Sequence, residues 1–192
     1  MKDSYYYLLG LIFVTSILRI IELRIAKSNL DQRKSSTLIQ VKEPFFFLFV
    51  VLHSSFLIIV PLEAILLDRE FNFIIALSSI SVYFICLLLR FHILFVLGKF
   101  WNTKIIYEKE IKEGIITNGI YKYIRHPNYL VVILEIASIS LFHSSYYSFI
   151  FFSIFNFILL FFRIKKEENA LFQNDYYSEH FQNKKRFIPY LF

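Results

Sequence analysis

The chain has 192 residues, of which 57% are hydrophobic, and its formal net charge is +6. Soluble domains contain about 45–50% apolar residues, and here the excess lies in long blocks, which is typical of bilayer-spanning helices. The lysines and arginines lie between these blocks, so the positive charge indicates membrane topology and contact with anionic lipids, and we predict no nucleic-acid partner. The single cysteine, Cys86, excludes an intramolecular disulfide and a cysteine-based metal site.

Five apolar blocks follow one another along the chain. They cover residues 5–23, 44–67, 71–97, 129–142 and 146–162. The fourth block is short for a span of about 20 residues, and only three residues, His143-Ser144-Ser145, separate it from the fifth. We therefore predict an all-α fold, a polytopic transmembrane helix bundle of about five spans whose last two helices form a tight hairpin.

The charge of the connections predicts how the bundle lies in the membrane. Residues 24–42, residues 98–128 and the segment after Arg163 are rich in lysine and arginine, whereas residues 68–70 and 143–145 are poor in net positive charge. The positive-inside rule places the basic segments in the cytoplasm. We expect the N-terminus outside and the C-terminus inside.

One integrated domain of residues 1–192 is expected, in two parts. Residues 1–97 are predicted to hold three N-terminal transmembrane helices. Residues 98–192 are predicted to hold a motif segment, a helical hairpin and a cytoplasmic C-terminal helix.

Polar residues gather just before the fourth block. Asn118-Gly119 is a turn signal, and Pro127 fits the first turn of the helix that follows. Arg125 and His126 therefore lie at a helix N-terminus at the membrane surface, where the helix dipole and free N–H groups favour an anion.

A second polar cluster follows the fifth block. Arg163 and Glu167 are four residues apart and share a helix face, and Glu168 follows directly. A two-span hairpin returns the chain to the side it left, so this cluster should come close to Arg125 and His126. Each element alone also has a simpler explanation, such as topological anchors or a surface ion pair. Together they predict a cytoplasmic pocket of cations, carboxylates and aromatic rings formed by the C-terminal half.

The order of these residues resembles a known family. The pattern is Thr117-x-Gly119-Ile120-Tyr121-x3-Arg125-His126-Pro127-x-Tyr129, then an apolar hairpin, then Arg163-x3-Glu167-Glu168 and a closing Phe187-Ile188-Pro189. This is similar to the isoprenylcysteine carboxyl methyltransferases and their small prokaryotic relatives. The resemblance covers residues 98–192, and the first three predicted spans match by general character. The family often has a glycine where Val131 stands here, which puts close helix packing at that point in doubt.

The resemblance implies a methyltransferase that uses S-adenosyl-L-methionine as its cofactor, and no metal. We assign cofactor binding to eleven residues of the motif, of the stretch before it and of the last helix: Glu113, Gly114, Ile115, Ile116, Tyr121, Arg125, His126, Pro127, Asn128, Tyr129 and Glu167. Physical chemistry agrees, because the cofactor carboxylate needs a cation or a helix N-terminus and its ribose hydroxyls need an acceptor such as Glu167. Its sulfonium is favoured by aromatic faces.

Two further residues, Arg163 and Glu168, are assigned to catalysis. Arg163 matches the family's substrate-binding arginine, and a guanidinium is suited to hold a carboxylate acceptor, which needs no base. A hydroxyl acceptor needs a proton acceptor, for which Glu168 or His126 are candidates.

The resemblance implies a lipidic or prenylated small-molecule acceptor whose carboxylate or hydroxyl oxygen receives the methyl group, in contact with membrane lipids. The chain is short, like the prokaryotic members, so we expect a multi-pass protein of the prokaryotic inner (cytoplasmic) membrane with its active site facing the cytoplasm. The stretch Arg19-Ile20-x-Glu22-Leu23 is also similar to bacterial members proposed to O-methylate long-chain polyketide lipids.

Other functions stay open at this stage. One is a phospholipid N-methyltransferase with the same cofactor, and another is an NADPH-dependent membrane reductase. A third is a non-catalytic membrane subunit, in which Glu63, Arg90, His92 and Glu135 would be the intramembrane polar groups of interest.

Overall fold

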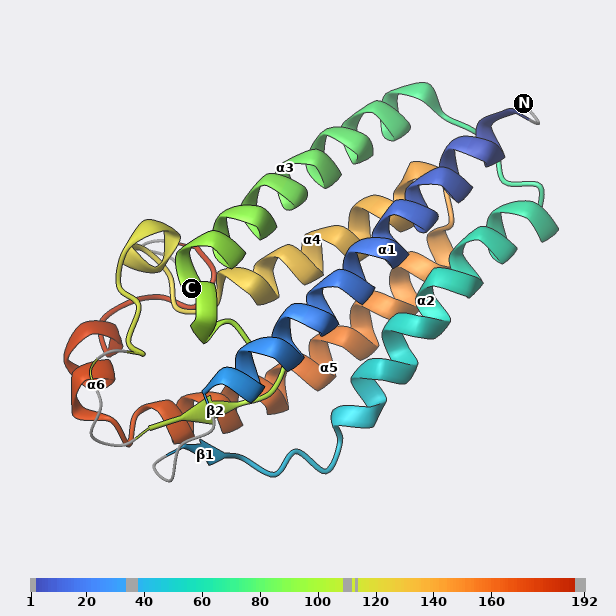
Figure 1. Ribbon diagram of the computed structural model, residues 1–192. Helices are drawn as coiled ribbons and strands as arrows, with labels where there is room; N and C mark the ends of the chain where they lie inside the picture. The colour runs from blue at the N-terminus through green and yellow to red at the C-terminus, as the bar shows by residue number, and fades with distance from the viewer. Residues whose placement is uncertain (1–2, 34–37, 109–111, 113, 189–192) are drawn as a thin grey trace.

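The computed structural model describes residues 3–33, 38–108, 112 and 114–188, and in it five helices lie side by side as a bundle (Figure 1). The bundle helices are α1 (Asp3–Gln32), α2 (Phe46–Leu66), α3 (Phe73–Leu97), α4 (Pro127–Phe142) and α5 (Tyr146–Leu171). The fold class predicted from the sequence is therefore confirmed.

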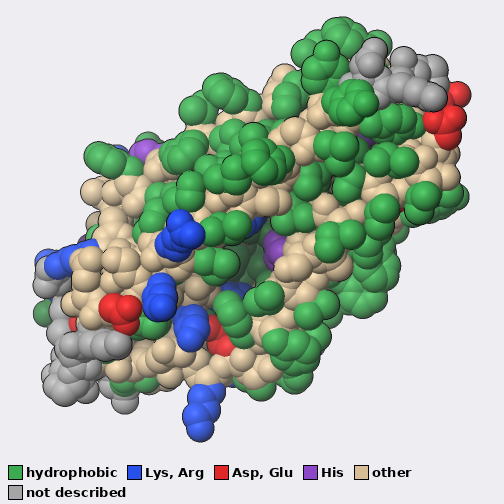
Figure 2. Space-filling view, turned by 45° about the vertical axis from the view of Figure 1, so that its right-hand side comes forward, with side chains coloured by type: hydrophobic (Ala, Val, Ile, Leu, Met, Phe, Trp, Pro, Cys, Tyr) green, Lys and Arg blue, Asp and Glu red, His purple; other side chains and the backbone are tan. Residues whose placement is uncertain are grey.

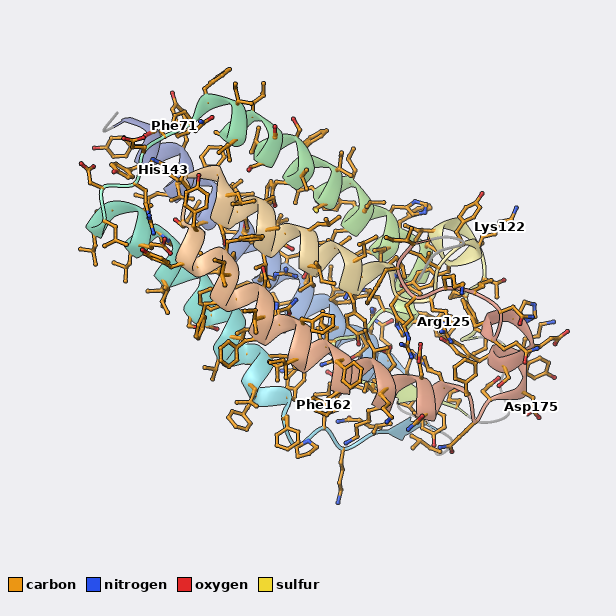
Figure 3. The ribbon with its side chains drawn as sticks, turned by 180° about the vertical axis from the view of Figure 1, so that it is seen from behind. Phe71, Lys122, Arg125, His143, Phe162 and Asp175 are labelled. Carbon is orange, nitrogen blue, oxygen red and sulfur yellow. The ribbon has the colours of Figure 1, made fainter. Side chains whose placement is uncertain are left out.

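Short elements collect at one end of the bundle. They are the 3-10 turns η1 (Gly98–Phe100) and η2 (Gly119–Lys122), the helix α6 (Asp175–Phe181), and the strands β1 (Ile39–Gln40) and β2 (Ile106–Tyr107). The two strands pair antiparallel, with Ile39 opposite Tyr107, and this pair was not predicted. Figure 3 shows Lys122, Arg125 and Asp175 at this end and Phe71 and His143 at the other.

Three of the described helices are long and apolar enough to cross a membrane, namely α2, α3 continued to Phe100, and α5. Helix α4 has 16 residues and rises by about 24 Å, less than the roughly 30 Å hydrocarbon core of a bilayer. Apolar side chains also gather over the upper and right-hand part of Figure 2, and Phe95 is 87% exposed. Such a surface suits lipid. The protein is a membrane protein, and the count of five spans stays a prediction.

Two helices extend beyond the apolar blocks that predicted them. Helix α1 continues from the first block to Gln32, and α5 continues from the fifth block to Leu171. The added residues are mostly good helix formers, and several carry charge, so they lengthen the helices without lengthening the apolar stretch. As a result Arg163, Glu167 and Glu168 lie on the last turns of α5.

Helix α4 is the most enclosed member of the bundle, because it packs against α1, α3 and α5. Val131 of α4 is fully buried and packs in a cluster with Cys86 and Ile93 of α3. A valine thus fills the place between α3 and α4 that raised doubt in the sequence, and Cys86 is a small buried hydrophobe.

The tight turn between α4 and α5 is built as the sequence predicts. Ser144 has a positive φ of 55°, and the Ser145 N–H donates to the Ser140 carbonyl at 2.9 Å. Glu63 of α2 accepts hydrogen bonds from the N–H groups of Tyr147 and Ser148, at 3.1 and 2.6 Å. Glu63 therefore caps the N-terminus of α5, which gives this buried carboxylate a structural role.

Gly119 generates the first testable prediction. Its φ is +56°, and a Cβ there would lie 2.7 Å from His92 Nε2 and 2.9 Å from Val96 Cγ2. We expect Gly119→Ala to lower the free energy of unfolding by about 1–3 kcal/mol through strain and overpacking. The measurement is unfolding of the detergent-solubilised protein, followed by circular dichroism. Gly10→Ala is the matched control, because nothing lies within 4 Å of its Cβ position. It should be neutral or stabilising, and equal stability of the two variants would contradict the packing described.

Candidate active site

A cavity of about 400 Å³ lies inside the bundle and reaches the short elements, since Phe100 of η1, Ile106 of β2 and Tyr177 of α6 are among its lining residues. Its size falls in the range of small-molecule sites, roughly 300–1,000 Å³. Every bundle helix contributes to the wall, with Arg19 from α1, His53 from α2, Arg90 from α3, Tyr129 from α4 and Arg163 from α5. The N-terminal helices therefore form part of a pocket that the sequence analysis assigned to the C-terminal half.

The motif before α4 is held by the C-terminal segment. Pro127 occupies the first turn of α4 and His126 precedes it as the N-cap residue. The backbone N–H groups of Arg125 and His126 donate to the carbonyls of Lys185 and Arg186, at 2.9 and 3.0 Å. Because these two motif donors are already satisfied, the backbone of the motif is fixed before any ligand binds.

A hydrogen bond to Glu168 holds the side chain of His126 in place. The Glu168 carboxylate accepts hydrogen bonds from Arg186, at 3.0 and 2.6 Å, and from His126 Nε2 at 3.0 Å. Arg125 lies 3.4 Å from the same carboxylate. A carboxylate only accepts, so His126 Nε2 carries the proton. The Nδ1 atom is then turned toward Glu167, whose Oε2 is 3.8 Å away.

Tyr129 lies between Arg163 and Glu167. Its hydroxyl donates to Glu167 Oε2 at 2.5 Å and accepts from Arg163 Nε at 2.9 Å. The Arg163 guanidinium also donates to the Thr103 carbonyl at 2.5 Å and forms an ion pair with Glu43 at 3.1 Å. All three nitrogens of Arg163 thus have protein partners, and Glu43 was not foreseen from the sequence.

The structure brings most of the predicted site residues to the cavity wall: Gly114, Ile115, Ile116, Tyr121, Arg125, His126, Asn128, Tyr129, Arg163 and Glu167. Pro127 and Glu168 lie behind that wall among buried residues. Glu113 and Pro189 lie outside the described residues.

Two buried polar atoms on the cavity residues have no hydrogen-bond partner within the described part of the chain, Asn128 Oδ1 and Arg125 Nε. Phe100, Trp101 and Tyr121 add aromatic rings to the same wall. Burial raises the pKa of the Tyr121 hydroxyl well above its ordinary value, so this group stays protonated near neutral pH. An acceptor, a cation and aromatic faces together fit an organic ligand that has donors, an anionic group and a positive charge.

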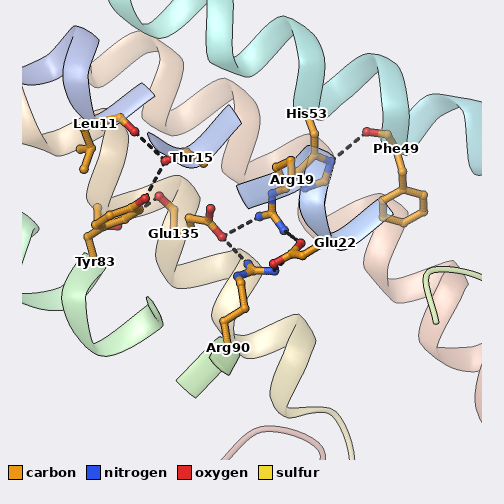
Figure 4. A network of polar contacts seen from close by, with 10 residues as sticks. Leu11, Thr15, Arg19, Glu22, Phe49, His53, Tyr83, Arg90 and Glu135 are labelled. Atoms are coloured by element: carbon orange, nitrogen blue, oxygen red, sulfur yellow. Dashed lines mark hydrogen bonds and ion pairs between the residues drawn. The ribbon is translucent and has the colours of Figure 1, made fainter. Parts of the chain in front are cut away.

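Arg19, Glu22 and Arg90 line the cavity, and they form one network of polar contacts with Glu135 (Figure 4). Arg19 donates to Glu22 at 2.9 Å and to Glu135 at 2.6 Å. Arg90 donates to both oxygens of Glu22, at 3.0 and 3.2 Å, and to Glu135. The rise along α4 from Tyr129 to Glu135 is about 9 Å, so this network lies one to two helical turns deeper than the motif.

Sequence reasoning missed the residues that α2 and the loop after α3 contribute. Phe46, Phe49 and His53 of α2 line the cavity, as does Thr103. Phenylalanines in an apolar block carry no signal that separates a cavity wall from a lipid-facing surface. His53 did offer one, because an ionisable residue inside a span is a functional candidate by default.

Comparison with known proteins agrees with this geometry. A sequence model of the isoprenylcysteine carboxyl methyltransferase (ICMT) family matches residues 77–173, from α3 through α5. The uncharacterized protein YpbQ of Bacillus subtilis (strain 168) is 33% identical over 164 residues, which cover 84% of this chain and 94% of that protein.

The Tyr129 hydroxyl generates a prediction about stability. Tyr129→Phe removes two hydrogen bonds to charged groups and leaves Arg163 Nε and Glu167 without this partner. We expect the free energy of unfolding to fall by about 1.5–3 kcal/mol, measured by denaturant unfolding in detergent. Tyr123→Phe is the control, since Tyr123 is 55% exposed and should change little. Equal stability of the two variants would show that the hydroxyl does not bridge the two charges.

Proposed function

Because the chain belongs to the isoprenylcysteine carboxyl methyltransferase family, and is therefore a membrane methyltransferase, we propose that it transfers a methyl group from S-adenosyl-L-methionine to an oxygen atom of a lipidic acceptor. The observation that carries this proposal is one cavity that combines the motif residues with an apolar wall inside a membrane-embedded bundle.

The motif end of the cavity suits the cofactor. Arg125 and the N-terminus of α4 would hold its carboxylate. Asn128 Oδ1 would accept a hydrogen bond from its ammonium or a hydroxyl, and Glu167 would accept from the ribose. The aromatic rings of the wall would favour its positive charge. When bound, S-adenosyl-L-methionine supplies a methyl carbon that is attached to a positively charged sulfur and is open to attack.

The protein's own contribution is alignment and exclusion of water. Glu168 acts as a positioning residue, because its carboxylate accepts hydrogen bonds from the His126 ring and from Arg186. Arg163 is the candidate for contact with an anionic acceptor oxygen. Its ion pair with Glu43 is the one contact that an acceptor carboxylate can replace in kind.

The apolar part of the cavity wall supports a lipidic acceptor. The cavity is lined by Phe46, Phe49, Val50 and Leu57 of α2 and by Leu160 of α5. These side chains would bury an acyl or prenyl chain, and each buried methylene contributes about 0.8 kcal/mol. We propose that the acceptor enters this space from the membrane.

Cofactor binding tests the proposal directly. We expect His126→Ala and Glu167→Ala each to weaken the binding of S-adenosylhomocysteine about tenfold, the equivalent of one lost hydrogen bond to a charged group. Isothermal titration calorimetry on the detergent-solubilised protein is the measurement. Lys165→Ala is the control, because Lys165 is exposed on the same helix. Unchanged affinity in both site variants, or a parent that binds NADPH instead, would refute the proposed cofactor site.

Orientation provides a second test. We propose that the motif end faces the cytoplasm of a prokaryotic cell, in its cytoplasmic membrane, because the connections at this end are basic. Reporter fusions after Asn29, Asp68, Thr103, Ser145 and Phe192 should alternate in, out, in, out and in. A reporter that faces out after Thr103 would place the motif on the opposite side from the cytosolic cofactor pool.

A further inference from the structure

The connection between α1 and α2 supplies a partner of Arg163 whose role the proposed function leaves open, Glu43. Its Oε2 atom forms the ion pair with Arg163 Nη1 at 3.1 Å, and its Oε1 atom accepts a hydrogen bond from the Ile105 N–H at 3.0 Å. The ion pair is largely enclosed, since 11% of the Arg163 side chain and 10% of the Glu43 side chain are exposed. Each carboxylate oxygen of Glu43 therefore has its own partner.

The start of α2 encloses the Arg163 guanidinium. The Phe46 N–H donates to the Glu43 carbonyl at 3.1 Å, which joins Glu43 to the first turn of α2. The guanidinium carbon lies 5.6 Å from the centre of the Phe46 ring and 5.1 Å from the centre of the Phe49 ring. Figure 1 shows the connection from β1 to α2 at the end of the bundle that carries the short elements. Aromatic faces attract a cation, so the two rings keep the guanidinium in place while it changes a charged partner.

Arg163 is bonded to more negative charge than it neutralises. Glu43 pairs with it directly, and Glu167 is bonded to it through the Tyr129 hydroxyl. These four side chains together have a formal charge of −1, and like charges at short range repel one another. A further anion at Arg163 is therefore opposed for as long as Glu43 remains paired.

Glu43 is the partner that an incoming anion displaces. The Tyr129 hydroxyl and the Thr103 carbonyl are neutral, whereas an anion replaces the Glu43 carboxylate in kind. Arg163 is among the residues that line the cavity and Glu43 is not, so an anion in the cavity and Glu43 compete for one guanidinium. When the ion pair opens, Glu43 keeps its hydrogen bond from the Ile105 N–H. Its carboxylate thus stays next to Arg163 and can pair with it again.

We propose that Glu43 is a built-in competitor for Arg163, which gives way to the anionic acceptor and pairs with Arg163 again once the acceptor has been methylated. This inference rests on the proposed function and concerns the release of its product. As the acceptor oxygen bonds to the methyl carbon, the carbon–sulfur bond breaks and its electron pair stays on sulfur. The negative charge of the oxygen and the positive charge of the sulfur both disappear. A neutral product cannot hold a guanidinium against a carboxylate, so Glu43 favours its release.

The test measures occupancy of the cavity by two probes, 11-bromoundecanoate and its methyl ester, which differ in charge. Trp101 is the single tryptophan and lines the cavity, so quenching of its fluorescence by bromine reports binding to the protein in nanodiscs. Glu43→Gln keeps an oxygen for the Ile105 N–H and removes the competing charge. We expect it to raise the affinity for the acid about tenfold, the equivalent of about one hydrogen bond between charged groups. The affinity for the ester should not change.

The matched control is Glu108→Gln. Glu108 also forms a partly buried ion pair with an arginine, Arg33, at 3.4 Å, and it does not line the cavity. The control removes the same charge at the same end of the bundle, and it should bind both probes as the parent does. An unchanged affinity for the acid in Glu43→Gln overturns the proposal. Equal gains in the two variants, or equal gains for acid and ester, overturn it as well.

Glu43→Asp is a second variant, which keeps the charge at this position and tests the proposal even where Glu43→Gln does not fold. Its side chain is one methylene shorter, so its carboxylate cannot reach Arg163 and Ile105 together. It should also bind the acid more tightly than the parent does, and parent-like or weaker binding overturns the proposal. The result is separate from the cofactor test. A chain that shows these gains but does not bind S-adenosylhomocysteine refutes the proposed function and leaves the competition at Arg163 standing.

Discussion

Arg19, Glu22, Arg90 and Glu135 lie in the interior of the bundle, and each guanidinium contacts both carboxylates. Ions in an apolar interior are costly unless they are paired, and removing one partner of such a pair typically costs about 3–5 kcal/mol. Since the four residues come from α1, α3 and α4, their pairing fixes how these helices are placed along the bundle axis. These three helices supply part of the cavity wall.

The second polar centre lies at the start of the same helix, α4. There Tyr129 joins Arg163 and Glu167, and His126 is held by Glu168. One rigid and enclosed helix therefore carries both centres, and the distance between them is set by the helical rise. In the function we propose, such a fixed spacing would help to align two ligands without a second domain.

The sequence predicts the helices and the motif well, because apolar blocks and turn residues act locally. Pro127 begins α4 and the His143–Ser145 turn closes the hairpin as expected. The sequence does not predict the ion pairs, since nothing local links Arg163 to Glu43 or Glu22 to Arg90. Those contacts depend on how helices rotate against one another. The role of Glu168 was hidden for the same reason, because its partner Arg186 comes from a later segment.

The segment 184–186 completes the site from a position that follows every bundle helix in the chain. Its carbonyls satisfy the backbone of Arg125 and His126, and Arg186 neutralises Glu168. Ribosomes build a chain from its N-terminus, so the motif stays incomplete while the helices are being inserted. The organisation of the motif is then a late event in biogenesis, after the bundle helices have been made. A partly synthesised chain would possess the bundle helices and no organised motif beside them.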